Sequence, residues 1–224
     1  YKKIGFKEVG RLRKAAEILG ETYDIIIMDM LREEFQSVYI KRKLEKYNLG
    51  GSVKDRAVLG MLEEAKRQGK VNSDTIIVEP TSGNTGIAVA ILASVLGLKA
   101  VIIMPESMSV ERRTLIKAYG AQLILTPKEL GIKGSIDKAA EIREKYDNAI
   151  SLSQFDNPAN PAYHYATTAK EILEQAPDLD IFVAGVGTGG TFSGVAKYLK
   201  ENKPEVLAIA LEPEESPAIS KGHG

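Results

Sequence analysis

The chain has 224 residues, of which 30 are Lys or Arg and 30 are Asp or Glu, so its formal net charge at pH 7 is zero. This balance argues against binding of nucleic acid or of an anionic membrane surface through excess positive charge. Because the sequence has no cysteine and only two histidines, His164 and His223, it excludes disulfides, thiolate metal sites and a cysteine nucleophile, and no multi-histidine metal site is expected.

The first forty residues have a less regular pattern than the rest. Lys7–Leu19 is predicted as a charged amphipathic helix, Ile25–Met30 is an apolar run too short for its period to decide its structure, and Val38–Leu44 is a predicted strand. No apolar run, Gly86–Leu98 included, is long enough to span a bilayer, and the chain start lacks the apolar segment of a signal peptide. We therefore expect a soluble, cytoplasmic protein.

From residue 52 onward, short β-branched runs alternate with helical patterns, which is typical of βαβ units whose parallel sheet is covered on both faces. Ser52 and Asp55 form a predicted capping box for a first helix that ends at Gly69. The other predicted helices are Gly86–Leu96, Val110–Tyr119, Ile136–Tyr146, Tyr163–Glu174 and Phe192–Glu201, and the predicted strands are Thr75–Glu79, Ala100–Met104, Gln122–Leu125, Ile150–Leu152, Ile181–Ala184 and Val206–Leu211. The predicted fold class is α/β, with parallel sheets flanked by helices.

A polar turn follows the first of these strands. The strand ends at Glu79-Pro80 and runs into Thr81-Ser82-Gly83-Asn84-Thr85-Gly86 at the start of a helix. The free N–H groups and the dipole of a helix N-terminus favour a carboxylate or a phosphate, and glycines let the backbone approach it closely. If this segment were only a helix cap with glycines for the turn, it would need fewer glycine, hydroxyl and amide residues than it has. We therefore predict an anion-binding site.

A second turn of this kind is Gly185-Val186-Gly187-Thr188-Gly189-Gly190-Thr191, which follows a strand and leads into a helix. Phosphate is the expected ligand. The turn also fits the G-x-G-x-x-G pattern, and Glu212 lies about twenty residues on, where a dinucleotide fold places its ribose-binding acid. A nicotinamide-dinucleotide-binding oxidoreductase is therefore an alternative, which ranks second because the pattern lies late in the chain.

Lys54 lies in the first turn of its predicted helix, directly after Gly50-Gly51-Ser52-Val53. The positive end of the helix dipole disfavours the charged amine, so we expect a lowered pKa and a more nucleophilic nitrogen. A lone lysine beside Asp55 and Arg56 would be interpreted as a surface residue. Together with a phosphate site it points instead to pyridoxal phosphate (PLP), an aldehyde cofactor that forms Schiff bases with lysine.

Several segments stand in the order found in the cysteine synthase (O-acetylserine sulfhydrylase) family of fold-type II PLP enzymes, which the chain resembles over about residues 38 to 218. The segments are Tyr47–Arg56, Glu79–Gly86, Met104–Arg113, Gln154–Pro161 and Gly187–Thr191. The resemblance implies a tryptophan synthase β-like PLP fold with a larger cofactor domain of residues 1–40 and 132–224, residues 41–85 shared, and a smaller moving domain of residues 86–131. The sequence departs from the family near Ile4–Leu12 and at Arg42-Lys43, and we expect it to lack the family's usual C-terminal part, including the serine that faces the pyridine nitrogen.

The resemblance also implies a role for each residue of the two turns. Lys54 would hold the cofactor as a Schiff base and act as acid and base at the substrate Cα, and Asn84 would bond the ring hydroxyl. The substrate carboxylate would be held by Thr81, Ser82, Gly83, Thr85 and Gln154, and the cofactor phosphate by Gly187, Thr188, Gly189, Gly190 and Thr191. No metal is implied.

The implied activity is that of a cysteine synthase, a PLP-dependent transferase that replaces the acetate of O-acetyl-L-serine with sulfide to give L-cysteine. Family members are commonly homodimers, and some bind a serine acetyltransferase. The sequence leaves open a PLP-dependent β-elimination enzyme, such as a serine or threonine dehydratase or a sulfide-releasing cysteine lyase. A catalytically silent binding protein and the nicotinamide-dependent oxidoreductase also stay open.

Overall fold

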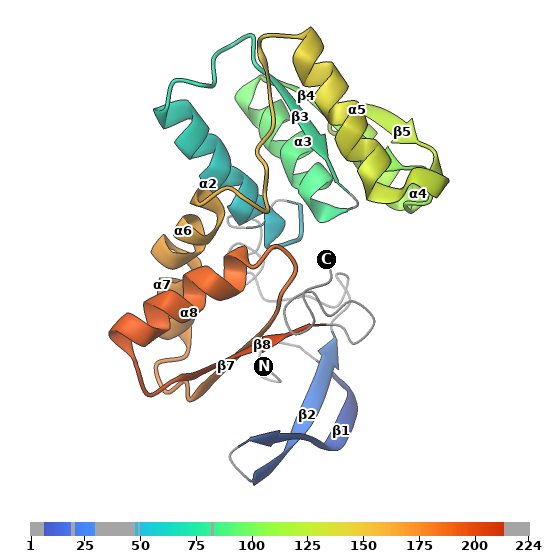
Figure 1. Cartoon of the computed structure of the whole chain (residues 1–224). Coiled ribbons are helices and arrows are strands. Elements are labelled where there is room, and N and C mark those ends of the chain that lie inside the picture. The colour runs from blue at the N-terminus through green and yellow to red at the C-terminus, as the bar shows by residue number, and fades with distance from the viewer. Residues whose placement is uncertain (1–6, 19–20, 30–47, 49, 82, 213–224) are drawn as a thin grey trace. The chain divides into compact units, whose positions relative to one another are not determined.

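The computed structural model describes residues 7–18, 21–29, 48, 50–81 and 83–212 (Figure 1). The chain divides into two compact units, residues 1–47 and residues 48–224. The predicted strand Val38–Leu44 lies outside the described residues.

The described part of the first unit is an antiparallel pair of strands, β1 (Lys7–Ile18) and β2 (Glu21–Asp29). The prediction of a helix over Lys7–Leu19 is wrong. The spacing of apolar residues within one segment does not show whether a partner strand is present. Here the β-branched run in β2 pairs with β1, and this pairing satisfies the backbone N–H and C=O groups that a helix would have bonded internally. Gly10, which lowers helix propensity, stands at a shift in the strand register.

The second unit alternates helices and strands, as the sequence predicts. Its elements are α2 (Lys54–Arg67), β3 (Ile76–Pro80), α3 (Asn84–Leu96), β4 (Lys99–Pro105), α4 (Val110–Ala118), β5 (Gln122–Thr126), the 3-10 helix η3 (Lys128–Leu130), α5 (Gly131–Lys145), β6 (Ala149–Ile150), α6 (Ala159–Ala166), α7 (Thr168–Gln175), β7 (Ile181–Gly185), α8 (Gly190–Asn202) and β8 (Leu207–Leu211). Among the described residues, β5-β4-β3-β6 form one parallel sheet and β7-β8 a second parallel pair. The predicted fold class, α/β with parallel sheets and flanking helices, is confirmed.

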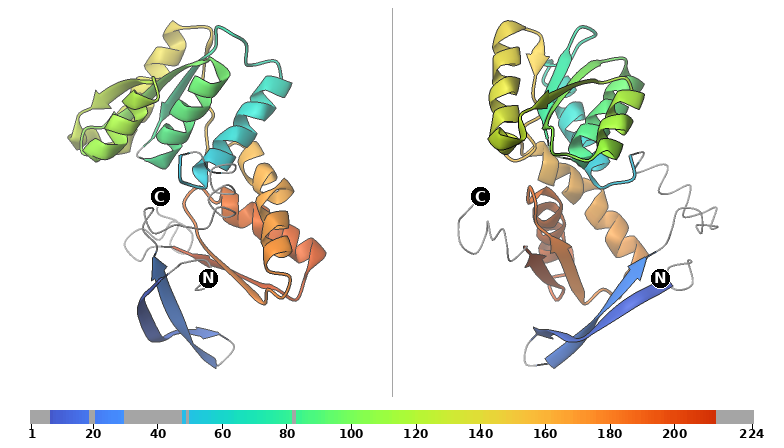
Figure 2. Two further views of the ribbon diagram at one scale, coloured as in Figure 1. Left: turned by 180° about the vertical axis from the view of Figure 1, so that it is seen from behind. Right: turned by 90° about the vertical axis from the view of Figure 1, so that its right-hand side faces the viewer.

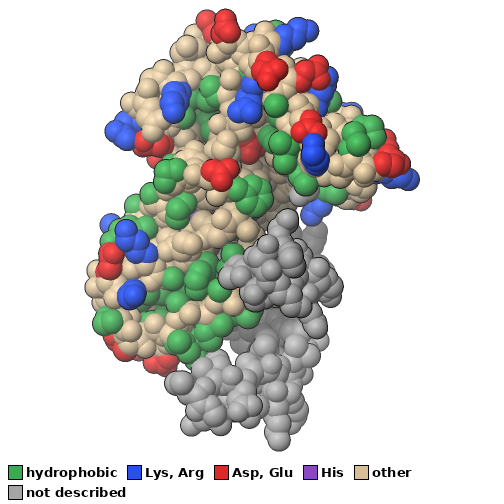
Figure 3. Space-filling model, viewed as in Figure 1, with side chains coloured by type: hydrophobic (Ala, Val, Ile, Leu, Met, Phe, Trp, Pro, Cys, Tyr) green, Lys and Arg blue, Asp and Glu red, His purple; other side chains and the backbone are tan. Residues whose placement is uncertain are grey.

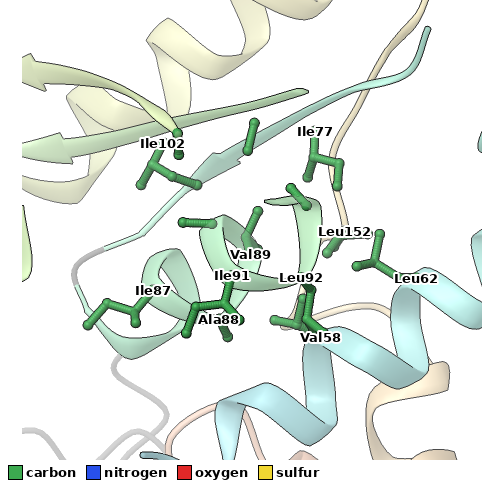
Figure 4. Packing of buried hydrophobic residues seen from close by; sticks show 14 of the residues in the cluster. Val58, Leu62, Ile77, Ile87, Ala88, Val89, Ile91, Leu92, Ile102 and Leu152 are labelled. Carbon is green, nitrogen blue, oxygen red and sulfur yellow. The ribbon is translucent and has the colours of Figure 1, made fainter. Parts of the chain in front are cut away.

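Helices cover both faces of the four-stranded sheet, because apolar side chains alternate along its central strands. Ile77 and Ile102 belong to the core that includes α2 and α3, whereas Val78 and Ile103 belong to a separate core that includes Ala139 of α5. The right-hand view of Figure 2 shows α5 on one side of the sheet and α3 on the other. Figure 4 shows the larger core, in which α3 lies between the sheet and α2.

The single helix predicted over Tyr163–Glu174 is two helices. α6 ends at Ala166, α7 begins at Thr168, and Thr167 between them has φ −124° and ψ −71°, outside the helical region. The Thr167 hydroxyl donates to the carbonyl of Tyr163 at 2.7 Å and so accompanies the break. The period of apolar residues continues through this point, which is why the sequence pattern does not reveal it.

The visible surface carries side chains of both charge signs close to one another, as the zero net charge leads one to expect (Figure 3). Hydrophobic side chains gather on this face over α8, β7 and β8. Val183 of β7 and Leu207 and Leu211 of β8 are exposed hydrophobic residues. No helix in the described part of the chain is both long and apolar enough to cross a membrane.

Candidate active site

Lys54 is the first residue of α2 and follows a turn that Asp55 closes. Asp55 accepts a hydrogen bond from the Gly50 N–H at 2.5 Å, and the Ser52 hydroxyl oxygen accepts one from the Lys54 N–H at 3.3 Å. The predicted capping box is therefore wrong: the N-cap is Val53, the Asp55 carboxylate bonds Gly50, and the Asp55 N–H donates to the Ser52 backbone carbonyl at 3.2 Å and not to its hydroxyl. The result is a fixed backbone at the point where the Lys54 side chain leaves the helix.

Burial lowers the pKa of the Lys54 amine below its ordinary value of 10.5. The direction agrees with the sequence-based expectation, and the cause in the structure is desolvation of the amine. Among the described residues the amine has no ion pair and no hydrogen bond that would favour its charged form. A larger fraction of it is therefore neutral near pH 7, which is the form that attacks an aldehyde.

The turn between β3 and α3 presents polar groups at the N-terminus of a helix. Thr81 and Thr85 are buried, Asn84 is exposed in the first turn of α3, and the Gly83 N–H donates to the Thr81 hydroxyl at 3.2 Å. A Cβ at Gly86 would lie 2.7 Å from the Thr81 side chain, so this glycine lets α3 approach the turn closely. Ser82 of the predicted set lies outside the described residues.

Gln154 reaches this turn from a loop that is distant in sequence. The Thr85 hydroxyl donates to Gln154 Oε1 at 2.7 Å, across 69 positions of the chain. The loop before Gln154 is held by Glu79, whose Oε2 accepts bonds from the Leu152 N–H at 3.0 Å and the Ser151 hydroxyl at 3.1 Å. Burial raises the pKa of the Glu79 carboxyl, and these bonds oppose that shift.

The turn between β7 and α8 exposes its backbone. Gly189 has φ +81°, a left-handed conformation in which glycine is favoured, and it caps α8. A Cβ at Gly187 would meet no described atom within 4 Å, so protein packing does not require glycine there. The Val186 N–H donates to the Leu211 carbonyl at 2.8 Å and the Gly190 N–H to the Thr188 hydroxyl at 3.4 Å. The N–H groups of residues 187–189 have no described partner, and the absence of a side chain at Gly187 leaves them accessible to an anion.

A buried histidine joins the second turn to α2. His164 Nε2 lies 3.2 Å from the Thr191 hydroxyl, and its Nδ1 lies 2.9 Å from the Thr168 hydroxyl. The Thr168 hydroxyl in turn accepts a bond from Arg56 at 3.0 Å. Burial, followed by the charges of Arg56 and Lys54, lowers the pKa of His164 to about 4, so the ring is neutral at pH 7 and bonds two hydroxyls without carrying charge.

The structure thus brings some of the predicted residues together through hydrogen bonds and leaves others without one. Thr85 contacts Gln154 directly, whereas the side chains of Lys54 and Asn84 have no hydrogen bond among the described residues. Sequence reasoning gave no role in the site to the residues that support it, which are Glu79, Asn160, His164, Thr168 and Glu171. Only two of them had a signal in the sequence. Glu79 is an acid at the end of the apolar strand Ile76–Pro80, and Asn160 is a polar residue between the prolines of Gln154–Pro161.

This arrangement defines a class: an α/β protein with a half-buried lysine at the start of one helix and glycine-rich polar turns at the starts of two others. The profile of the family described as pyridoxal-phosphate dependent enzymes matches residues 28–224, and the chain belongs to this family. Its cofactor is pyridoxal 5'-phosphate. The alternative interpretation of the second turn as a nicotinamide-dinucleotide site is therefore rejected.

Three similar proteins carry more specific names. A cysteine synthase from a Flavobacterium species is 49% identical over 213 residues, which are 95% of this chain and 68% of that protein. The solved structure of a hydrogen sulfide-producing enzyme from Fusobacterium nucleatum has a TM-score of 0.75 at 46% identity, covering 80% of this chain and 60% of that one. The structure of an O-ureido-L-serine synthase has a TM-score of 0.76 at 46% identity, covering 81% and 58%. The chain therefore spans about two thirds or less of the length of the proteins that it matches.

The residues present fit the phosphate and the aldehyde of this cofactor. The open backbone at Gly185 and Gly187, the left-handed Gly189 and the N-terminus of the 13-residue helix α8 suit a dianionic phosphate. The desolvated amine of Lys54 suits a Schiff base with the aldehyde.

Proposed function

We propose that the chain carries the active site of a PLP-dependent β-replacement enzyme that converts O-acetyl-L-serine and sulfide into L-cysteine and acetate. The observation that carries this proposal is the 2.7 Å bond between Thr85 and Gln154, which joins a helix N-terminus to a side-chain amide. Together these groups suit an amino-acid carboxylate, because the backbone N–H groups of the helix start and the Gln154 amide nitrogen, which this bond orients, can donate to its oxygens. The similarity to a cysteine synthase supports the choice of substrate.

Each residue then has a defined task. Lys54 would hold the cofactor, and its amine, once free, would take the proton from the substrate Cα and later return it. Thr81, Ser82, Gly83, Thr85 and Gln154 hold the substrate carboxylate and thereby direct the Cα–H bond toward the Lys54 amine. The Gly187–Thr191 turn holds the cofactor phosphate, and Asn84 bonds the ring hydroxyl. When bound, PLP supplies an electron acceptor for the charge that develops at Cα, so that the C–O bond to acetate breaks and sulfide adds to Cβ.

A spectroscopic experiment tests the assignment of Lys54. The protein incubated with PLP should show a visible Schiff-base band, and borohydride reduction should leave the cofactor on the peptide that contains Lys54. O-acetylserine should shift the band, and cysteine should form when sulfide is added. Lys54→Ala should lose the band and the turnover, whereas Lys70→Ala, on an exposed residue, should keep both. A wild-type protein without a visible band would refute the proposal.

The second candidate is a sulfide-releasing reaction on cysteine by the same site, which the similarity to a hydrogen sulfide-producing enzyme favours. It uses the same residues at Cα and differs in the group that leaves Cβ. Parallel measurements of cysteine formed from O-acetylserine plus sulfide, and of sulfide released from cysteine, decide between the two. The larger kcat/KM identifies the activity.

We further propose that residues 86–131 form a smaller domain that closes over the bound amino acid. Residues 1–40 and 132–224 form a larger cofactor domain, and residues 41–85 are shared between the two. β4 lies in the smaller domain and pairs with β3 over five residue pairs, so closure would carry β3 with it. Slower amide exchange in β4 and α3 on addition of O-acetylserine would support closure.

By resemblance we also propose a cytoplasmic homodimer that can bind a serine acetyltransferase. Light scattering with and without that partner would test the dimer and the complex.

A further inference from the structure

We propose that Asn160 is a positioning residue that couples the two anion-binding turns, so that occupation of the phosphate turn prepares the amino-acid site. This inference rests on the proposed function. Its basis is one side-chain nitrogen with two partners: Asn160 Nδ2 donates to the backbone carbonyl of Gln154 at 2.9 Å and to the Thr188 hydroxyl at 3.1 Å. Gln154 belongs to the loop that bonds Thr85 of the first turn, Thr188 belongs to the second turn, and this amide lies between them.

The orientation of the Asn160 amide is determined by its partners. The Gln154 carbonyl can only accept, so the atom that faces it must be the nitrogen. Oδ1 then points toward Gly190, and this oxygen is buried without a hydrogen-bond partner among the described residues. A buried acceptor without a partner is unfavourable. The two hydrogen bonds that Nδ2 donates offset this unfavourable free energy.

Gly190 makes room for this arrangement. A Cβ at Gly190 would lie 2.1 Å from Asn160 Oδ1, so any other residue there would push the amide away from Thr188. Asn160 itself is only 2% exposed and lies in the first turn of α6, where its own N–H donates to the Asn157 carbonyl at 3.1 Å. The side chain has little freedom to move, so a displacement of the Thr188 turn is transmitted to the Gln154 backbone.

The consequence is a linkage between the two ligands. A phosphate that fixes the Thr188 hydroxyl also fixes the Asn160 amide, and through it the Gln154 segment whose side chain bonds Thr85. Linkage of this kind is reciprocal, so a change at Asn160 should weaken the binding of both ligands. Asn157 offers a matched control, because it holds the same loop through the Leu152 carbonyl at 2.8 Å but does not reach Thr188.

The test measures two affinities in the same 224-residue protein. The dissociation constant of PLP is obtained from the growth of the visible band, and the O-acetylserine concentration for a half-maximal band shift is obtained afterwards at saturating PLP. Asn160→Ala should raise both values about tenfold, the effect of one buried hydrogen bond. Asn157→Ala should raise only the O-acetylserine value. Thr188→Val, which removes the link without altering the core of α6, should also raise the O-acetylserine value although Thr188 belongs to the phosphate turn.

The outcomes separate this inference from the proposed function. A wild-type protein that develops no visible band counts against the proposed function. A wild-type protein that behaves as proposed, with Thr188→Val changing PLP affinity alone, overturns the coupling. So does an Asn160→Ala protein whose two values stay within about twofold of wild type, even if its melting temperature falls, because the coupling requires that both values change.

Discussion

Arg56 and Glu171 form a two-pronged ion pair, with Nη2 to Oε2 at 2.7 Å and Nη1 to Oε1 at 3.2 Å. The pair joins α2, which begins with Lys54, to α7, 115 positions further along the chain. The two side chains are only 11% and 25% exposed, so water screens the interaction poorly. The pair therefore fixes the helix that begins with Lys54, the residue proposed to hold the cofactor.

Loss of this carboxylate should destabilise the fold. Glu171→Ala leaves a largely buried guanidinium without its principal counter-charge, and we expect the free energy of unfolding to fall by about 2–4 kcal/mol. Urea denaturation at pH 7 measures the change. The control is Asp137→Ala, whose pair with Lys133 is 63% and 81% exposed and should contribute less than about 1 kcal/mol. Equal losses in the two variants would show that Glu171 does not have the role assigned to it.

Two glycines of the second turn should respond differently to the same substitution. Gly187→Ala places a methyl group in open space, so the unfolding free energy should stay within about 0.5 kcal/mol of wild type while PLP binds about tenfold more weakly. Gly190→Ala forces a methyl group against Asn160 and should cost about 1–3 kcal/mol of stability. Urea denaturation without PLP and a PLP titration, on both variants, make the comparison. Unchanged PLP affinity in Gly187→Ala would count against the phosphate role of this turn.

The fold of the second unit was largely predictable because its pattern is local. β-branched runs such as Ile76–Val78 are bounded by turn residues, and glycines with hydroxyl residues mark both helix starts that follow β3 and β7. These signals depend on neighbours in sequence. The hairpin of β1 and β2 was not predictable in the same way, because the partner strand, and not the pattern within Lys7–Ile18, decides its conformation.

The supporting contacts of the site could not be predicted for a related reason. Arg56, His164 and Glu171 are ordinary residues of their own segments, and they acquire a function only when α2, α6 and α7 meet. Lys54 is an intermediate case. Its position at a helix start correctly indicated a lowered pKa, but the cause in the structure is burial, which is a property of the folded chain that a local sequence pattern does not show.

His164 should make the stability of the protein depend on pH. Burial and the nearby charges of Arg56 and Lys54 lower its pKa to about 4 in the folded chain, against an ordinary value of 6.5. Between these values the unfolded chain binds a proton on this ring and the folded chain does not. The stabilising contribution is therefore complete above about pH 6.5 and is lost as the pH falls toward 4, by about 3 kcal/mol in total.

The experiment compares wild type with His164→Asn, which has an amide of similar size that does not titrate. Urea denaturation between about pH 7 and pH 4.5 should show a steeper loss of stability in the wild type than in the variant. The raised pKa values of Glu79 and Asp55 act in the opposite direction, because those carboxyls bind protons more tightly in the folded chain. Both are present in the two proteins, so the difference between the curves isolates His164. Parallel curves would mean that the ring titrates normally in the folded protein, and that it does not join Thr191 to Thr168 as a neutral group.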